Sequence, residues 1–407
     1  MPEISTESDV DAVLGPEGII GEAIDDFEPR QSQLEMARLI SQAIAEGKTY
    51  LIEASTGIGK SYAYLVPAFL SDKKTIISTG TKNLQDQLFD KDIPLIRKIL
   101  VGNKRVALLK GRSNYCCPFR IDKFRKHKQF QTREMASVFA ALQEWSNLSD
   151  SGDIGEFSGI PENDRLWFYA TSNADNCLGS ECPDFDRCFV AKARKKALEA
   201  DLVVINHHLY FSDLALKEEG FGELLPEADV LIFDEAHQLP DIASHFFGES
   251  LNMRQLELLS KDSLEAGVAE AADSKALVKP CDQLTKSVAD FRLALGQFPQ
   301  KSEWSRIQNA PPIKQALESL KASMSELSEV LEPMVSRGKE LASCFHRLET
   351  IDAILGRFLD PDDSEVSWYE LSERGFRFVT SPIDISDSFR QKLDGSDFAS
   401  VFFTSAT

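Results

Sequence analysis

The sequence predicts an α/β fold in which helices cover both faces of a parallel β-sheet. Short apolar runs rich in β-branched or aromatic residues recur along the chain, and a small or polar residue ends each of them at a turn. Because the hydrophobicity within each run is nearly continuous, we expect strands that are buried on both faces. The runs are Tyr50–Glu53, Thr75–Ser78, Leu202–Ile205, Val230–Phe233 and Val401–Thr404, with a less β-branched sixth at Val106–Leu109.

Two long stretches interrupt this pattern. Residues 112–190 hold a basic run and five of the seven cysteines without a strong strand signal, so they are interpreted as an inserted module. Residues 245–370 have a helical period, with two apolar stripes that we expect to pack on each other. One stripe is Leu284, Val288, Phe291, Leu295 and Phe298, and the other is Leu317, Leu320, Met324, Leu327 and Leu331.

Length and composition limit the class of protein. The chain has 407 residues, enough for two or three domains, and 43% of them are hydrophobic, which is ordinary for a globular protein. No apolar run approaches the ~18 residues that a membrane span requires. Nine acidic residues and no base precede Arg30, which is the reverse of a basic secretory leader. We therefore expect a cytoplasmic protein without a membrane association.

The charge is uneven along the chain. A net charge of −20 argues against a protein that coats nucleic acid with its whole surface. Residues 104–128 nevertheless hold nine Lys and Arg with one acid, and residues 192–196 hold four bases with none. These stretches predict either a solvated face or a local basic groove.

A phosphate-binding loop is predicted after the first strand, in the sequence Ala54-Ser-Thr-Gly-Ile-Gly-Lys-Ser61. A strand, a Gly-containing loop and a helix that starts with Lys-Ser wrap backbone N–H groups around phosphates. Lys60 is predicted to neutralise the β- and γ-phosphates of ATP, and the Ser61 hydroxyl to ligate Mg²⁺. Since Ala54 stands where the general pattern has glycine, a chance Gly-Lys-Ser turn is the alternative. The predicted nucleotide-binding residues here are Thr56, Gly57, Gly59, Lys60 and Ser61.

A pair of acids follows the run Val230–Phe233, in the sequence Asp234-Glu235-Ala236-His237. Two acids after a buried strand are costly unless they meet a cation, and a Mg²⁺-nucleotide supplies one. Asp234 is predicted to hold the metal and Glu235 to act as the general base on the attacking water. His237 completes the predicted catalytic set with Lys60. A different Mg²⁺ enzyme or a simple helix cap would use the same acids, but the presence of both motifs favours nucleotide hydrolysis.

Together the two motifs resemble those of superfamily 2 helicases, in which alanine at the first loop position is common. Arg30 and Gln33, in Phe-x-x-Arg-x-x-Gln spacing, resemble the adenine-recognising Q motif. Ser78-Thr-Gly-Thr81 with Leu84 and Gln85 resembles motif Ia, which contacts the DNA backbone, and Ser405-Ala-Thr407 resembles motif III, which couples hydrolysis to movement.

The cysteines are predicted to bind a metal centre. From spacing alone, iron–sulfur and zinc are equally plausible, because both take four thiolates. The sequence Gly111-Arg-x-Asn-Tyr-x-Cys117, followed by three more cysteines, is similar to the iron–sulfur module of the XPD/DinG helicases. This resemblance implies a 4Fe–4S cluster, and it favours Cys117 over the adjacent Cys116 as first ligand. The implied ligands are Cys117, Cys177, Cys182 and Cys188.

The resemblance spans nearly the whole chain and is nearest to the bacterial YoaA branch of DinG-like helicases. It implies a first RecA-like domain made of residues 1–111, 191–244 and 371–407. An iron–sulfur module at 112–190 and a helical arch at 245–370 would be inserted into it, with single-stranded DNA passing between them. The candidates for DNA contact are Arg112, Arg120, Lys123, Lys126, Lys195 and Lys196, with Tyr115 or Phe119 for base stacking. The second RecA-like domain is expected to be absent from these 407 residues, which would leave this chain alone inactive.

The leading hypothesis is therefore an ATP-dependent 5′–3′ DNA helicase of repair or replication restart, represented here by its first motor half. The resemblance to the YoaA branch also suggests contact with the polymerase III χ subunit. The alternatives are a redox-sensing iron–sulfur DNA-binding module without productive ATPase activity, and a zinc-stabilised ATPase that remodels protein. Within the helicase class, a DinG-type enzyme that resolves R-loops or quadruplexes is also open.

Overall fold

The computed structural model of the chain describes residues 6–24, 27–100, 104–126, 132–173, 176–218, 224–373 and 375–406. The chain divides into two compact units. The first, called the sheet unit below, comprises Met1–Asn173, Pro183–Ile242 and Phe389–Thr407. The second, called the helical unit, comprises Ala174–Cys182 and Ala243–Ser388.

The sheet unit contains a six-stranded parallel sheet in the order β1-β10-β5-β2-β4-β3. All six predicted strands form, each within about two residues of the expected bounds. The central strands β2, β4 and β5 are buried along their whole length, as expected for a sheet covered on both faces. The strands are β1 (Tyr50–Glu53), β2 (Thr75–Thr79), β3 (Val106–Leu108), β4 (Leu202–Asn206), β5 (Val230–Asp234) and β10 (Ser400–Ser405).

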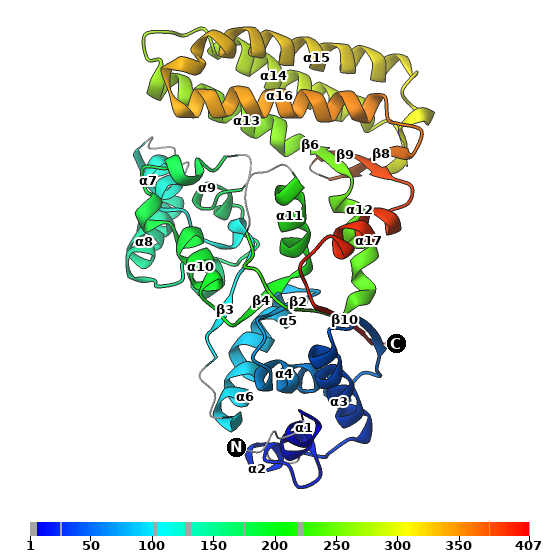
Figure 1. The fold of residues 1–407 in the computed structure, drawn as a ribbon. Helices are drawn as coiled ribbons and strands as arrows, with labels where there is room; N and C mark the ends of the chain where they lie inside the picture. The colour runs from blue at the N-terminus through cyan, green and yellow to red at the C-terminus, as the bar shows by residue number, and fades with distance from the viewer. Residues whose placement is uncertain are drawn as a thin grey trace. The chain divides into compact units, whose positions relative to one another are not determined.

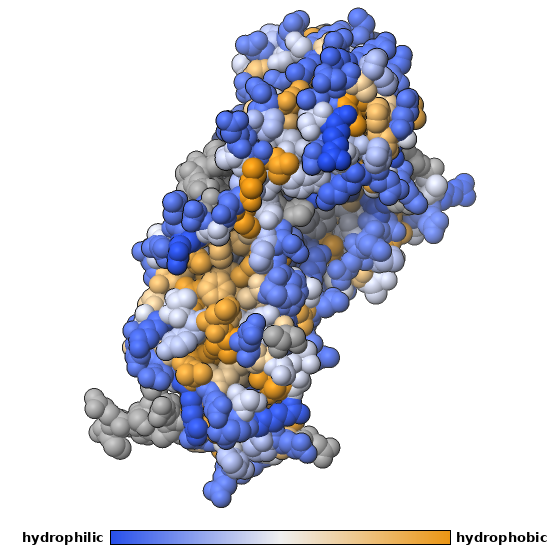
Figure 2. All heavy atoms as spheres, turned by 90° about the vertical axis from the view of Figure 1, so that its right-hand side faces the viewer, coloured by the Kyte–Doolittle hydropathy of each residue, from blue (hydrophilic) through white to orange (hydrophobic). Residues whose placement is uncertain are grey.

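Strand β1 departs from the expected burial. It lies at the edge of the sheet, and the Leu51 side chain is 72% exposed. An edge strand has only one neighbour, so part of its surface stays accessible even where its sequence is apolar. Figure 2 shows a face of the molecule on which apolar side chains gather in a patch among hydrophilic ones.

Helices cover both faces of this sheet (Figure 1). On one face α1, α3, α4 and α6 share an apolar core with the sheet, which includes Ile40, Leu65 and Ile232. On the other face the ring of Phe233 contacts Tyr210 of α11 and Phe389 of α17. The helices that lie wholly in this unit outside residues 112–198 are α1 (Thr6–Leu14), α2 (Ile20–Ala23), α3 (Gln31–Glu46), α4 (Lys60–Leu70), α5 (Lys82–Gln87), α6 (Ile93–Leu100) and α11 (His207–Glu218), with a π-helical turn at Leu88–Asp92. Helices α12 (Leu239–Phe246) and α17 (Ser386–Asp394) are divided between the two units.

The described residues of 112–190 form short helices and turns around an apolar cluster of their own. The cluster includes Ile121, Phe124, Phe139, Leu142 and Trp167. The helices of this region are α7 (Pro118–Lys126), α8 (Arg133–Leu148), α9 (Trp167–Ala170) and α10 (Phe189–Leu198). The division into two units does not separate this stretch as predicted, because Ala174–Cys182 belongs to the helical unit and the rest of 112–190 to the sheet unit.

The helical unit contains four long helices whose apolar stripes pack on each other as predicted. Eight of the ten stripe residues are buried, while Phe298 and Leu317 are partly buried against the same core. A polar contact lies within this core, since the Ser287 and Ser323 hydroxyls are 2.6 Å apart. The helices are α13 (Met253–Glu270), α14 (Val278–Leu295), α15 (Pro311–Leu331) and α16 (Lys339–Leu359).

The helical unit also contains an antiparallel sheet that the sequence did not predict. Its strand order is β6-β9-β8-β7. The expected end of the helical stretch at residue 370 therefore differs from the structure, in which the unit extends to Ser388. Buried and accessible residues alternate along β8, so it lacks the continuous apolar run that identified the other strands. The strands are β6 (Glu249–Asn252), β7 (Lys301–Glu303), β8 (Glu365–Ser372) and β9 (Gly375–Pro382).

Candidate active site and cysteine module

The loop between β1 and α4 has the backbone that a phosphate-binding loop requires. Gly57 and Gly59 adopt φ angles of 81° and 84°, in the left-handed region that side chains disfavour. A Cβ atom at Gly59 would also collide with the amide of Gln33. These two glycines allow the chain to enter α4 at Lys60, with the first N–H groups of the helix pointing out of its end, toward where phosphates bind.

Gln33 supports this loop directly. Its side chain is 3% exposed, and its Nε2 atom donates a hydrogen bond to the Gly59 carbonyl at 2.9 Å. Arg30 lies at the N-cap of α3 and is exposed. The sequence predicted that both residues read adenine. The contact in the structure adds a second role for Gln33, as a support of the phosphate loop.

Asp234 is a buried acid held by three donors. The Tyr64 and Thr404 hydroxyls and the Glu235 backbone N–H each donate to its carboxylate at 3.1 Å. Burial raises the pKa of Asp234, and the neighbouring Glu235 raises it further. A carboxylate that is penalised in this way gains most from a nearby cation, as the prediction of a Mg²⁺ ligand requires.

Glu235 lies between two further residues of the predicted catalytic set. Its Oε1 atom is 3.5 Å from Lys60 Nζ, and its Oε2 atom is 3.3 Å from His237 Nδ1. The same His237 nitrogen lies 3.1 Å from the Ser405 hydroxyl on β10. Glu235 has a φ of 57° and is the one non-glycine residue with positive φ in the described ranges. Such strained backbone is typical of functional sites.

The structure thus brings together residues that lie far apart in the sequence. The phosphate loop follows the carboxyl end of β1, and the acid pair and Ser405 lie at the carboxyl ends of β5 and β10. These three strands are neighbours in the sheet. Ligands of parallel α/β sheets bind at this edge. One ammonium, one buried carboxylate and one candidate base in a single site fit the binding and hydrolysis of a Mg²⁺-nucleotide. Ser61, the second predicted metal ligand, follows Lys60 in the first turn of α4. Thr407 lies outside the described residues.

Two supporting residues were not identified from the sequence. Tyr64 is fully buried, and burial raises its pKa well above the usual value, so it stays a hydroxyl donor to Asp234. Thr404 donates to the other oxygen of the same carboxylate. Only their positions relative to the motifs could have suggested this role. Tyr64 lies one helical turn after Lys60, and Thr404 directly precedes Ser405.

The four predicted cluster ligands share an intermediate exposure, whereas Cys116 is 2% exposed within the apolar cluster of the module. Cys117 and Cys188 belong to the sheet unit, and Cys177 and Cys182 belong to the helical unit. Among the residues that the structure describes, no group of three or more His, Cys, Asp or Glu side chains is arranged to hold a metal ion.

Four cysteines are a donor set that both iron–sulfur clusters and zinc accept. The Gly179 backbone N–H donates a hydrogen bond to the Cys177 sulfur at 3.4 Å. Hydrogen bonds to sulfur of this kind tune the thiolates that hold iron–sulfur clusters.

Some of the predicted DNA-contacting residues have internal partners. The Tyr115 side chain is 4% exposed and its hydroxyl accepts a hydrogen bond from the Lys110 N–H, so base stacking by Tyr115 is not supported. Arg112 and Arg120 donate to the carbonyls of Asn173 and Phe168, within the module. Lys195 and Lys196 are exposed on α10, and Phe119 and Lys123 are partly exposed. The Lys126 side chain lies outside the described part of the chain.

The fold and the site have the arrangement of a nucleotide-binding α/β domain. A family model described as "DEAD/DEAH box helicase" matches residues 33–115. Over nearly its whole length, the chain is similar to two proteins named "ATP-dependent DNA helicase YoaA". It is 42% identical over 403 residues to that of Haemophilus influenzae and 43% identical over 395 residues to that of Escherichia coli. The chain is therefore similar over nearly its whole length to proteins named as ATP-dependent DNA helicases.

The alignments cover 98% and 97% of the chain but 63% and 62% of these two relatives, so the chain spans less than two thirds of their length. An "ATP-dependent helicase DinG" of Mycobacterium tuberculosis is 36% identical over 235 residues, which are 52% of the chain and 34% of that protein. A solved XPD helicase structure aligns with 15% identity and a TM-score of 0.47, over 92% of the chain and 58% of its own. None of the described helices has both the length and the apolar composition that crossing a bilayer requires.

Proposed function

We propose that the chain is the first motor half of an ATP-dependent DNA helicase that moves 5′–3′ along single-stranded DNA in repair or replication restart. The main support is the convergence of Lys60, the Asp234–His237 motif and Ser405 at one edge of the sheet. The relatives named YoaA are ATP-dependent DNA helicases by their names, and the similarity to them extends over nearly the whole chain.

Each residue of the site has a role in this proposal. Lys60 and the N–H groups at the start of α4 would bind the β- and γ-phosphates, and Ser61 and Asp234 would hold Mg²⁺. The bound metal would neutralise charge on the phosphate oxygens. Glu235 accepts the proton of the attacking water, and the contact of His237 with Ser405 connects this base to β10. Arg30 and Gln33 remain the candidates for adenine recognition.

We also propose that Cys117, Cys177, Cys182 and Cys188 hold a 4Fe–4S cluster. Their intermediate exposure supports this, because Cys116, Cys281 and Cys344 are instead packed in apolar cores. Cys117→Ser is expected to lower the iron and sulfide content of anaerobically purified protein, whereas the matched Cys116→Ser is expected to retain both. Equal loss in the two variants would contradict the assignment of Cys117 as a ligand.

The domain organisation that accompanies this function is also a proposal. The module at 112–190 and the helical arch at 245–370 would be insertions into the RecA-like domain, and single-stranded DNA would pass between them. The exposed Lys195 and Lys196 are the preferred candidates for phosphate contacts. Contact with the polymerase III χ subunit rests on the resemblance to the YoaA branch alone.

The decisive experiment measures ATP hydrolysis and strand separation by the whole protein, with and without single-stranded DNA. Glu235→Gln is expected to retain nucleotide binding while hydrolysis falls by about 10²–10⁴-fold, as for other general bases. Glu46→Gln, at an exposed carboxylate at the end of α3, is the control and is expected to retain activity. Absence of DNA-stimulated hydrolysis in the unmodified protein would overturn the proposal and favour a DNA-binding module without ATPase activity.

A further inference from the structure

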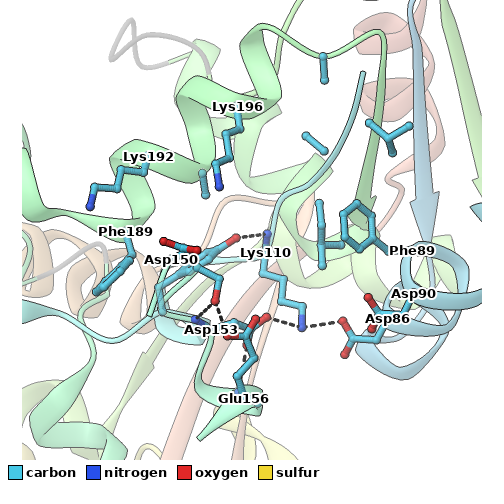
Figure 3. Close-up of a pocket in the computed structure, with 18 of the residues that line it drawn as sticks. Asp86, Phe89, Asp90, Lys110, Asp150, Asp153, Glu156, Phe189, Lys192 and Lys196 are labelled. Carbon is cyan, nitrogen blue, oxygen red and sulfur yellow. Dashed lines mark hydrogen bonds and ion pairs between the residues drawn. The ribbon is translucent and has the colours of Figure 1, made fainter. Parts of the chain in front are cut away.

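A pocket of about 590 Å³ lies within the sheet unit, between the edge strand β3, helix α10 and the module (Figure 3). Ala107 and Leu108 of β3 line one part of it, and Phe189 of α10 lines another. Because open space of this size takes the place of side-chain contacts, the packing between the module and the sheet is incomplete here.

A buried lysine beside this pocket connects the two parts by charge. Lys110 is 7% exposed, and its ammonium lies 2.6 Å from Asp86 Oδ1 and 2.7 Å from Asp153 Oδ2. Asp86 belongs to α5, whereas Asp153 belongs to the module. Figure 3 shows the Lys110 side chain extending between the two carboxylates.

Backbone contacts strengthen the same junction. The Lys110 N–H donates to the Tyr115 hydroxyl at 3.0 Å, and Tyr115 pairs with Asp153 in an isolated antiparallel bridge. On the other side, the Gln85 amide of α5 donates to the Leu109 carbonyl at 2.9 Å. Helix α5, the end of β3 and the loop at Asp153 therefore meet at Lys110.

We propose that Lys110 is a positioning residue that couples the module at 112–190 to α5. This helix contains Leu84 and Gln85 of the sequence that resembles the DNA-contacting motif Ia. Two carboxylates on one buried ammonium form a stiff link, since removing the ammonium leaves the largely buried Asp153 carboxylate without its cation. The adjoining pocket leaves room for the module to shift once this link breaks. Engagement of DNA at α5 is thereby transmitted to the module, and disorder in the module is transmitted to α5. The expected effect on DNA-stimulated ATP turnover rests on the proposed helicase function, whereas the contacts of Lys110 do not depend on it.

The test compares Lys110→Met with Lys192→Met in the whole protein. Lys192 lines the same pocket but is exposed, so its loss is the matched control. Amide hydrogen exchange is measured in α5, in α7 and α8 of the module, and in β1 and β5 as internal references. Lys110→Met is expected to speed exchange in α5 and the module about tenfold and to leave β1 and β5 unchanged.

Activity provides the readout that a merely structural residue would not give. In Lys110→Met, ATP turnover stimulated by single-stranded DNA is expected to fall at least about fivefold, while turnover without DNA is retained. Lys110→Arg is expected to restore stimulation, because the cavity can hold the larger guanidinium between the same carboxylates. If Lys110→Met does not fold, Asp153→Asn, which removes one charge and keeps the shape, is used in its place.

The outcomes separate this inference from the proposed function. Unchanged exchange in both α5 and the module of Lys110→Met, or faster exchange in the module alone, would overturn the coupling. Equal loss of turnover with and without DNA would show a general structural role and would overturn it as well. An unmodified protein without DNA stimulation would instead overturn the proposed function, and the exchange measurement would still decide whether Lys110 links the module to α5.

Discussion

Gly59→Ala is expected to weaken nucleotide binding much more than Gly57→Ala, although the two glycines have nearly the same backbone conformation. Their φ angles are 84° and 81°. An L-residue in this region costs about 1–2 kcal/mol, which is a factor of about 5–30 in an equilibrium. This strain applies to both positions. It sets the whole effect of Gly57→Ala, since no atom lies within 4 Å of a Cβ placed there.

At Gly59 a second cost is added. The new Cβ would collide with the Gln33 amide, which donates to the Gly59 carbonyl at 2.9 Å. Moving Gln33 away loses a hydrogen bond worth about 0.5–1.5 kcal/mol, so the total is about 1.5–3.5 kcal/mol. If the loop must regain this conformation to bind phosphate, the affinity for nucleotide is expected to fall by about 10- to 400-fold.

Titration with a fluorescent ATP analogue in the presence of Mg²⁺ measures this effect, and the Tm of each variant checks folding. Gln33→Ala removes the obstacle, so in that background Gly59→Ala is expected to cost no more than Gly57→Ala. Equal losses for the two glycine variants when Gln33 is present would refute the reasoning. The same holds if the effect of Gly59→Ala is undiminished when Gln33 is replaced.

Three further predictions concern stability. Burial raises the pKa of Asp234, so its charge opposes folding at pH values above the raised pKa. Asp234→Asn is therefore expected to raise the Tm at neutral pH in the absence of nucleotide. A lower Tm of this variant would contradict the argument. Burial lowers the pKa of His207 to about 4. The free energy of unfolding is therefore expected to fall by up to about 3 kcal/mol as the pH drops from about 6.5 toward 4. Thermal melts of a His207→Gln variant should lack this part of the pH dependence. In the helical unit, Arg347→Met breaks a buried pair with Asp262 at 2.8 Å and is expected to cost about 3–5 kcal/mol in urea unfolding. Arg337→Met, at an exposed pair, is expected to cost about 0–1 kcal/mol, and similar costs for the two would count against the burial argument.

The sequence predicted the central sheet because the parallel strands are buried on both faces and therefore consist of continuous apolar runs. The antiparallel strands of the helical unit lack this signal. In β8, the buried Ser367 and Tyr369 alternate with accessible residues, and Glu365 and Glu370 interrupt any apolar run. Such a strand is identified by its pairing with a neighbouring strand, here β9, and this pairing exists only in the folded chain.

The candidate site was predictable to the extent that its chemistry requires consecutive residues. A phosphate loop needs its glycines and lysine within a few positions, and two acids on one strand end are adjacent by necessity. The residues that hold these groups have no such constraint. Tyr64 and Thr404 each lie 170 positions from Asp234, and Lys110 pairs with Asp153 of the module at 112–190. Their identities matter only through contacts that the fold creates, so a local pattern cannot reveal them.

It follows that variants of the supporting residues test the fold of the site, while variants of Lys60 and Glu235 test its chemistry. Tyr64→Phe, which removes one donor from the Asp234 carboxylate and keeps the ring, distinguishes the two: it is expected to weaken Mg²⁺-nucleotide binding by about 5- to 10-fold while the turnover of bound ATP is retained. A loss of turnover without any loss of affinity would instead place Tyr64 in the chemical step.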